Sequence, residues 1–145
     1  MPPMSSEVAA QFAATSPSAR EGMLALRQMV FATAAGTPGV GPLTEALRWG
    51  QPAYLTQETG AGSSLRIGPF GPGFALFVHC QTSLIADFLS GPGAGFRTSG
   101  SRAVVFDSIG DLDPGPISGL IRTALTWHLR GRKTMRSRGK TGRST

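Results

Sequence analysis

The stretch E-A-L-R-W-G-Q-P-A-Y, residues 45–54, joins a helical N-terminal third to a strand-rich middle and organises the rest of the chain. Pro52 fixes its own φ and disfavours helical geometry in the residue before it, so a helix must stop there. Gly50 can take the left-handed conformation that ends a helix. We therefore expect a rigid junction that presents two aromatic rings, Trp49 and Tyr54. The rings would pack under a sheet or form the wall of a pocket.

Length and composition indicate one domain in a reducing compartment. A chain of 145 residues suits a single domain with its own core. Cys80 is the only cysteine, so no internal disulfide can form, as is usual in the cytoplasm. The N-terminus lacks the basic start and apolar centre of a secretory signal, and no apolar run approaches the ~20 residues that span a bilayer. We expect a cytoplasmic protein that does not insert into a membrane.

The net charge of +6 belongs to the C-terminal end of the chain. Residues 130–145 hold seven of the 14 basic residues and no acidic one, which leaves residues 1–129 with seven basic against eight acidic side chains. Residues 132–145 are basic, rich in Ser and Gly, and without periodicity, so they are predicted to form a disordered tail. Such a tail is either a solvated extension or a weak, non-specific nucleic-acid binder that acts by neutralising phosphates.

Helical patterns occur at both ends of the chain. Residues 1–15 are predicted to form an N-terminal helical extension. Ser16 followed by proline opens a long second helix, and residues 42–49 are predicted to form a short third one. Asp113 followed by proline is the clearest helix start, and the helix it opens has a buried stripe that reaches His128.

The middle of the chain has the alternation and apolar content of strands. The most apolar segment, residues 74–80, is predicted to be central, with Ala75, Phe77 and His79 on one face and its other residues on the opposite face. The order of elements predicts an α+β fold for residues 16–131, an antiparallel sheet with helices mainly on one face. The strands are expected at residues 53–56, 63–67, 74–80 and 102–106, with a turn at 68–73 and a short helix at 83–89.

Five segments together resemble a known family. E-A-L-R-W-G-Q-P-A-Y-L-T, S-L-R-I-G, F-A-L-F-V-H-C-Q-T, S-R-A-V-V-F and I-R-T-A-L-T-W-H are similar, in that order, to the YdhG-like bacterial family of domains of unknown function, which includes a frataxin-like iron chaperone. The resemblance runs from about Arg20 to Arg130 and implies a two-layer sandwich similar to frataxin. It implies little about function. Iron handling in frataxin-like proteins uses acidic surface, and the first long helix here has only Glu21 as an acid, which disfavours that role.

Arginines in the strand region suggest a ligand site, because a guanidinium can bind carboxylate or phosphate with two parallel hydrogen bonds. We expect Arg66 and Arg102 on the sheet face away from the helices. Two alternatives remain: the arginines form structural ion pairs with Glu45, Asp87 or Asp107, or this face is an apolar homodimer interface. The hypothesis is a shallow site for a small anion with an apolar part, formed by Trp49, Gln51, Tyr54, Arg66, Phe77, His79 and Arg102.

Enzyme chemistry has weaker support in the sequence. Adjacent strand residues point to opposite faces, so His79 and Cys80 cannot form a dyad with each other. Cys80 is either a small buried apolar residue or a reactive thiol that uses His128 as its base, with His128 otherwise a half-buried packing residue. No metal-ligand spacing and no dinucleotide fingerprint occurs, so no catalytic residue, metal or cofactor is assigned.

We therefore interpret the chain as a small binding module for an anionic and apolar ligand or for a protein partner, rather than as an enzyme. The alternatives are a Cys80-dependent enzyme or thiol factor, and a nucleic-acid accessory protein that acts through its tail.

Overall fold

In the computed structural model, which describes residues 1–79 and 82–129, residues 45–54 form a β-hairpin. Strands β1 (Thr44–Arg48) and β2 (Gln51–Leu55) pair antiparallel with Arg48 opposite Gln51. Trp49 and Gly50 form the two-residue turn with φ of 56° and 72°, and positive φ at both positions marks the type I′ turn of tight hairpins. The predicted helix at residues 42–49 is wrong. Gly50 does adopt the left-handed conformation, but there it turns a hairpin instead of ending a helix.

Six antiparallel strands form one open sheet in the order β1-β2-β3-β4-β6-β5. The remaining strands are β3 (Leu65–Phe70), β4 (Gly73–Val78), β5 (Thr98–Ser99) and β6 (Ala103–Phe106). The four predicted strands correspond to β2, β3, β4 and β6. However, β3 continues through Gly68 and Pro69, so the connection to β4 is shorter than the predicted turn at 68–73.

The described helices are α1 (Ser6–Ala13), α2 (Pro17–Ala35), α3 (Leu84–Leu89), the 3-10 helix η1 (Ile109–Asp111) and α4 (Pro114–Leu125). The two starts predicted from a capping residue followed by proline, at α2 and α4, are confirmed. The buried stripe of α4 ends with the helix at Leu125, and His128 beyond it is exposed. The expectation of a half-buried His128 is therefore wrong.

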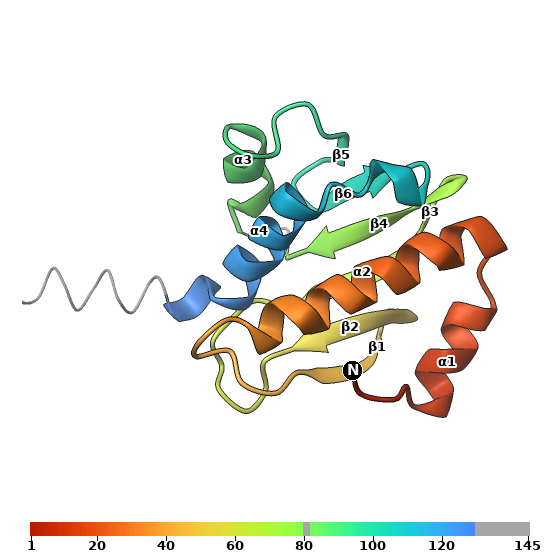
Figure 1. The fold of residues 1–145 in the computed structure, drawn as a ribbon, viewed down its shortest axis with the longest axis horizontal. Helices are drawn as coiled ribbons and strands as arrows, with labels where there is room; N and C mark the ends of the chain where they lie inside the picture. The colour runs from red at the N-terminus through yellow and green to blue at the C-terminus, as the bar shows by residue number, and fades with distance from the viewer. Residues whose placement is uncertain (80–81, 130–145) are drawn as a thin grey trace, which may run out of the picture.

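The helices pack against one face of the sheet (Figure 1). Phe74, Leu76 and Val78 of β4 join buried residues of all four α-helices in the main core, including Val8 and Phe12 of α1. This confirms an α+β fold with an antiparallel sheet, and the predicted division of β4 between its two faces. No helix in the described part of the chain combines the length and apolar character needed to cross a bilayer.

The face away from the helices, called the outer face below, has a small cluster of its own. It consists of Ala75, Phe77, Ala103 and Val105, of which even the most accessible, Phe77, is only 9% exposed. The outer face therefore lacks the exposed apolar patch on β4 and β6 that the homodimer alternative required.

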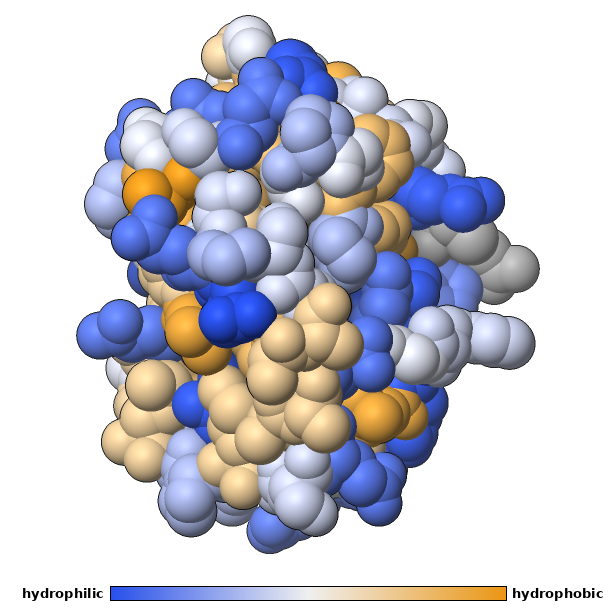
Figure 2. Space-filling model, turned by 90° about the vertical axis from the view of Figure 1, so that its right-hand side faces the viewer, coloured by the Kyte–Doolittle hydropathy of each residue, from blue (hydrophilic) through white to orange (hydrophobic). Residues whose placement is uncertain are grey.

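The side of the molecule on which α1 lies faces the viewer in Figure 2, and much of its lower half is weakly hydrophobic. Four alanines in and just after α1 are exposed: Ala9, Ala10, Ala13 and Ala14. Single methyl groups add little apolar area, so this surface by itself does not call for a partner.

Candidate functional site

Cross-strand pairing separates the residues of the hypothesised site, because opposite residues of an antiparallel pair share a face. Arg66 stands opposite Ala53 on one side and Phe77 on the other, so Arg66 and Phe77 both lie on the outer face. Tyr54 stands opposite Leu65 and is fully buried in the main core. Tyr54 therefore lies outside the site in which the sequence analysis placed it, because it is one residue away from the outward-facing position.

Four of the hypothesised residues line a hollow of about 450 Å³, which Trp49 of the β1–β2 turn shares with residues next to the start of β3, the end of β4 and the start of β6. Two guanidinium groups and an imidazole face this space, and none of the described residues that line it is acidic. A local excess of positive charge with fork-shaped donors suits a small anion. The lining residues are Trp49, Ser64, Arg66, Val78, His79 and Arg102.

Gln51 and Phe77 do not line the hollow, but they hold one of its arginines in place. Arg66 Nη1 donates a hydrogen bond of 2.8 Å to Gln51 Oε1, and its guanidinium carbon lies 5.4 Å from the centre of the Phe77 ring. Gln51 reaches Arg66 across Gly68, where an added Cβ would lie 2.5 Å from Gln51 Nε2. Because Gly68 has no side chain, the amide of Gln51 can cross it and bind Arg66.

Trp49 is 89% exposed at the tip of the hairpin. Its left-handed backbone conformation costs a non-glycine residue about 1 kcal/mol, and Asn, Asp or Gly would normally occupy this position of the turn. Of the two alternatives for this ring, packing under the sheet is wrong, and Trp49 instead lines the hollow. The hairpin turns the chain over between Trp49 and Gln51 and so leaves the ring outside the core.

Sequence reasoning missed Arg48 as a further cation of this surface. Arg48 stands opposite Gln51, so it shares the outer face, and its side chain is exposed. The signal was present as strand alternation within residues 45–48, but the assignment of a helix there concealed it.

The acidic residues that could have neutralised Arg66 and Arg102 are bound to other groups. Asp107 pairs with Arg97 at 2.6 Å, and Asp87 accepts a hydrogen bond from the hydroxyl of Ser83. Glu45 pairs with Arg27 on the opposite face of the sheet. Among the described residues, the alternative in which the two site arginines form ion pairs with these three carboxylates is therefore not observed.

Arg27, Glu45 and Tyr54 form a buried network on the helix-covered face. Arg27 Nε and Nη2 donate to the two carboxylate oxygens of Glu45 at 2.6 and 2.9 Å, and the Tyr54 hydroxyl donates to Oε2 at 2.8 Å. Arg27 Nη2 also donates to the carbonyl oxygen of Pro2 at 2.8 Å. The side chains of Arg27 and Glu45 are 4% and 9% exposed. The network ties α2 and the N-terminal segment to the hairpin.

Electrostatics keep Arg27 charged and Tyr54 neutral near neutral pH. The hydrogen bonds that Arg27 donates to the Glu45 carboxylate raise the pKa of Arg27 above its ordinary value. Burial raises the pKa of Tyr54 well above its ordinary value, and the neighbouring Glu45 carboxylate adds to that effect. Every buried side-chain polar atom in the described part of the chain has a hydrogen-bond partner, so this network is complete without a ligand.

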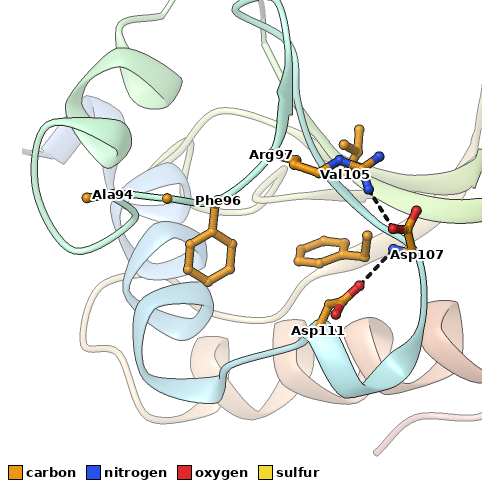
Figure 3. A pocket seen from close by; sticks show the side chains of 8 residues that line it. Ala94, Phe96, Arg97, Val105, Asp107 and Asp111 are labelled. Carbon is orange, nitrogen blue, oxygen red and sulfur yellow. Dashed lines mark hydrogen bonds and ion pairs between the residues drawn. The ribbon is translucent and has the colours of Figure 1, made fainter.

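A second hollow, of about 410 Å³, lies between the segment before β5 and the start of η1 (Figure 3). Its charged groups already have partners within the protein. Arg97 pairs with Asp107 at 2.6 Å, and Asp111 Oδ2 accepts from the backbone N–H groups of Asp107 and Ser108 at 3.0 and 3.3 Å. A third hollow, of about 640 Å³, lies between the N-terminal segment and α2 and is lined mainly by apolar residues such as Phe31 and Leu43. Neither hollow gathers the cations that an anion site requires.

Cys80 and the basic tail lie outside the described residues. The structure therefore says nothing about a thiol reaction of Cys80 with His128, or about nucleic-acid binding by residues 132–145. Within residues 1–79 and 82–129, no group of three or more His, Cys, Asp or Glu side chains is arranged to hold a metal ion.

Fold and hollow together define a class: a small α+β protein with a cationic surface site beside an exposed tryptophan. No protein-family model, no curated protein and no solved structure matches the chain. A function for this chain therefore has to be argued from the geometry of the site.

Proposed function

We propose that the protein is a binding module for a small anionic ligand with an apolar part, held in the hollow at the end of the outer face. One observation carries this proposal: Arg66, Arg102 and His79 line the same hollow as the exposed ring of Trp49, with no acid among the described residues of that lining. The guanidinium groups supply hydrogen-bond donors in the fork geometry that phosphate and carboxylate accept. The indole supplies the flat apolar surface.

The positioning of Arg66 supports the proposal. A long side chain loses rotamer entropy when it binds, and this loss is smaller when the side chain is already held. The amide of Gln51 and the ring of Phe77 both restrain Arg66, and neither restraint involves a charged group. Affinity for an anion gains from such preorganisation.

We also propose, on the strength of the resemblance in the five sequence segments, that the fold is the frataxin-like two-layer sandwich of the YdhG-like family and that the protein works in the cytoplasm. The proposal does not extend to iron handling. A hollow lined by Arg66 and Arg102 repels cations, and the acids Glu45 and Asp107 are engaged in ion pairs.

The test is a thermal-shift series with phosphate, pyrophosphate, citrate and salicylate, because a ligand that binds only the native state raises the melting temperature. We expect Arg102→Gln to remove the stabilisation by these anions. Arg122→Gln is the matched control, since Arg122 is an exposed arginine on α4 and its loss changes the net charge equally. Arg66→Met, which keeps an aliphatic stem over Phe77, should also remove it. Equal loss in the Arg122 variant, or no stabilisation of the wild-type protein, would refute the proposal.

A further inference from the structure

Trp49 has two unfavourable features that the fold itself does not explain. It is the most exposed large apolar side chain of the described residues, at 89%, and their only non-glycine residue with positive φ. It takes no part in either hydrophobic cluster. The turn would form more easily with Asn in its place, since Asn tolerates the left-handed conformation. Strain and exposure at one residue point to a contact made with something outside the chain.

The position of the ring indicates which chemical groups a ligand at this place would need. Trp49 lines the same hollow as Arg66 and Arg102, and its two-residue turn holds the backbone between paired strands. An indole face stacks well on other flat aromatic rings, and nucleic-acid bases are the common biological partners of such platforms. A phosphate group matches the guanidinium forks beside it. A cavity of about 450 Å³ lies within the range of small-molecule sites.

From these observations we infer that the ligand is a nucleotide, with its base stacked on Trp49 and its phosphate bound by Arg66 and Arg102. This inference rests on the proposed anion site and names the ligand class of that site. Ser64, which also lines the hollow, adds a hydroxyl group able to bind a sugar or phosphate oxygen.

Charge favours a free nucleotide over a long single strand. A polyanion binds by contacts to many phosphates in succession, and such binding needs an extended basic surface. Residues 1–129 carry one more acidic than basic side chain, so the body of the protein does not attract a polymer. The cations of the site are gathered around one hollow, which suits one phosphate group or a short run of them.

The test compares the affinity of the full chain for AMP, ribose 5-phosphate and an eight-residue oligo(dA), measured by isothermal titration calorimetry. We expect AMP to bind about tenfold or more tightly than ribose 5-phosphate, because stacking of the base adds affinity that the sugar phosphate lacks. Trp49→Asn should abolish this ratio, because it weakens the binding of AMP far more than the binding of ribose 5-phosphate. Trp49→Tyr, which keeps a stacking ring, should retain most of it.

Phe70→Ser is the matched control, since Phe70 is a partly exposed ring that does not line the hollow. This variant should keep the AMP to ribose 5-phosphate ratio of the wild-type protein. Equal affinity of the wild-type protein for both compounds, or equal losses for both in Trp49→Asn, would overturn the nucleotide inference and leave the anion site intact. Absence of binding by either compound would overturn both proposals. Affinity for the oligonucleotide that exceeds that for AMP and depends on Trp49 would overturn the free nucleotide in favour of a single strand.

Discussion

Residues 45–54 of the β1–β2 hairpin have opposite roles on the two faces of the sheet. On the helix-covered face, Glu45 and Tyr54 are cross-strand partners that close a buried network with Arg27. On the outer face and at the tip, Arg48 and Trp49 are exposed to solvent. The strand period of two makes this division possible, because successive residues point to opposite sides.

The difference separates an arginine that is neutralised inside the fold from arginines that border a hollow. Arg27 is buried against a carboxylate that takes two hydrogen bonds from it, so its charge is neutralised inside the protein. Arg66 and Arg102 instead border an open hollow without acids, next to an exposed ring. A positive charge that the protein surrounds with its own acids stabilises the fold, and one set beside a hollow can bind an anion.

The strongest test of the buried face is Glu45→Ala. The substitution leaves the guanidinium of Arg27 buried without its carboxylate, so we expect a loss of about 3–5 kcal/mol in the free energy of unfolding, measured in urea. Glu58→Ala is the control, since Glu58 is exposed and its removal should change stability by less than about 0.5 kcal/mol. A cost below about 1 kcal/mol for Glu45→Ala would mean that the network does not hold the hairpin to α2.

The pH dependence of Tyr54 gives the next largest effect. The chain has one tyrosine, so phenolate absorbance reports this residue alone. Because burial raises the pKa of Tyr54 above its ordinary value of 10.0, the unfolded protein ionises first. Its contribution to stability is therefore complete below pH 10 and is lost as the pH rises above that value, at about 1.4 kcal/mol per pH unit.

The expected observation is that phenolate absorbance of the folded protein stays absent above pH 10 and appears only with unfolding, whereas the protein in urea titrates normally. Tyr54→Phe supplies the control. Its stability should be lower by about 1 kcal/mol at neutral pH because Glu45 loses a hydrogen bond, and it should fall less steeply at alkaline pH. An ordinary phenolate titration of the folded protein would show that Tyr54 is accessible to solvent.

Substitutions of Trp49 at the exposed tip should raise stability or leave it nearly unchanged, unlike those of the buried network. Trp49→Asn replaces a strained residue with one that the turn prefers, so we expect the free energy of unfolding to rise by up to about 1 kcal/mol. Trp49→Ala should change stability by less than about 1 kcal/mol. Urea unfolding measures both. A loss of 3 kcal/mol or more, as a buried ring would give at about 3–5 kcal/mol, would place Trp49 in the core and break the contrast between the two faces.

The smallest effect on stability is expected for Gly68→Ala. The added methyl group meets the movable end of the Gln51 side chain, so the strand pairing should persist and stability should change by less than about 0.5 kcal/mol. Displacement of Gln51 should release Arg66 and weaken anion binding a few-fold in the thermal-shift series. Gln51→Ala should weaken it to the same extent. Unchanged anion binding in both variants would show that Gln51 does not position Arg66.

Several parts of the site follow from local patterns in the sequence. The alternation along β4 placed Phe77 on the face away from the helices, and the same reasoning placed Arg66 there with it. Tyr54 and Trp49 were assigned to the same pocket because the segment was read as a helix that ends in a strand. The hairpin instead places the ring of Tyr54 in the core and leaves the ring of Trp49 at the tip.

What the sequence determined by itself rests on interactions between near neighbours. Capping residues followed by proline set the starts of α2 and α4, the apolar alternation of residues 74–78 set β4 and its two faces, and the charge count set a nearly neutral body. Each of these depends on steric or electrostatic preferences within a few residues, so it can be recognised without a partner segment.

Only the tertiary structure decided the conformation of residues 44–48 and the roles of the arginines. A short segment with both helical and strand patterns takes the form that its neighbours stabilise, and here those neighbours are β2 and Arg27, the latter 18 residues away from Glu45. The position of Trp49 outside the core, and the gathering of Arg66 and Arg102 around one hollow, depend in the same way on strand register. Register results from contacts between segments far apart in the chain, and no local pattern encodes it.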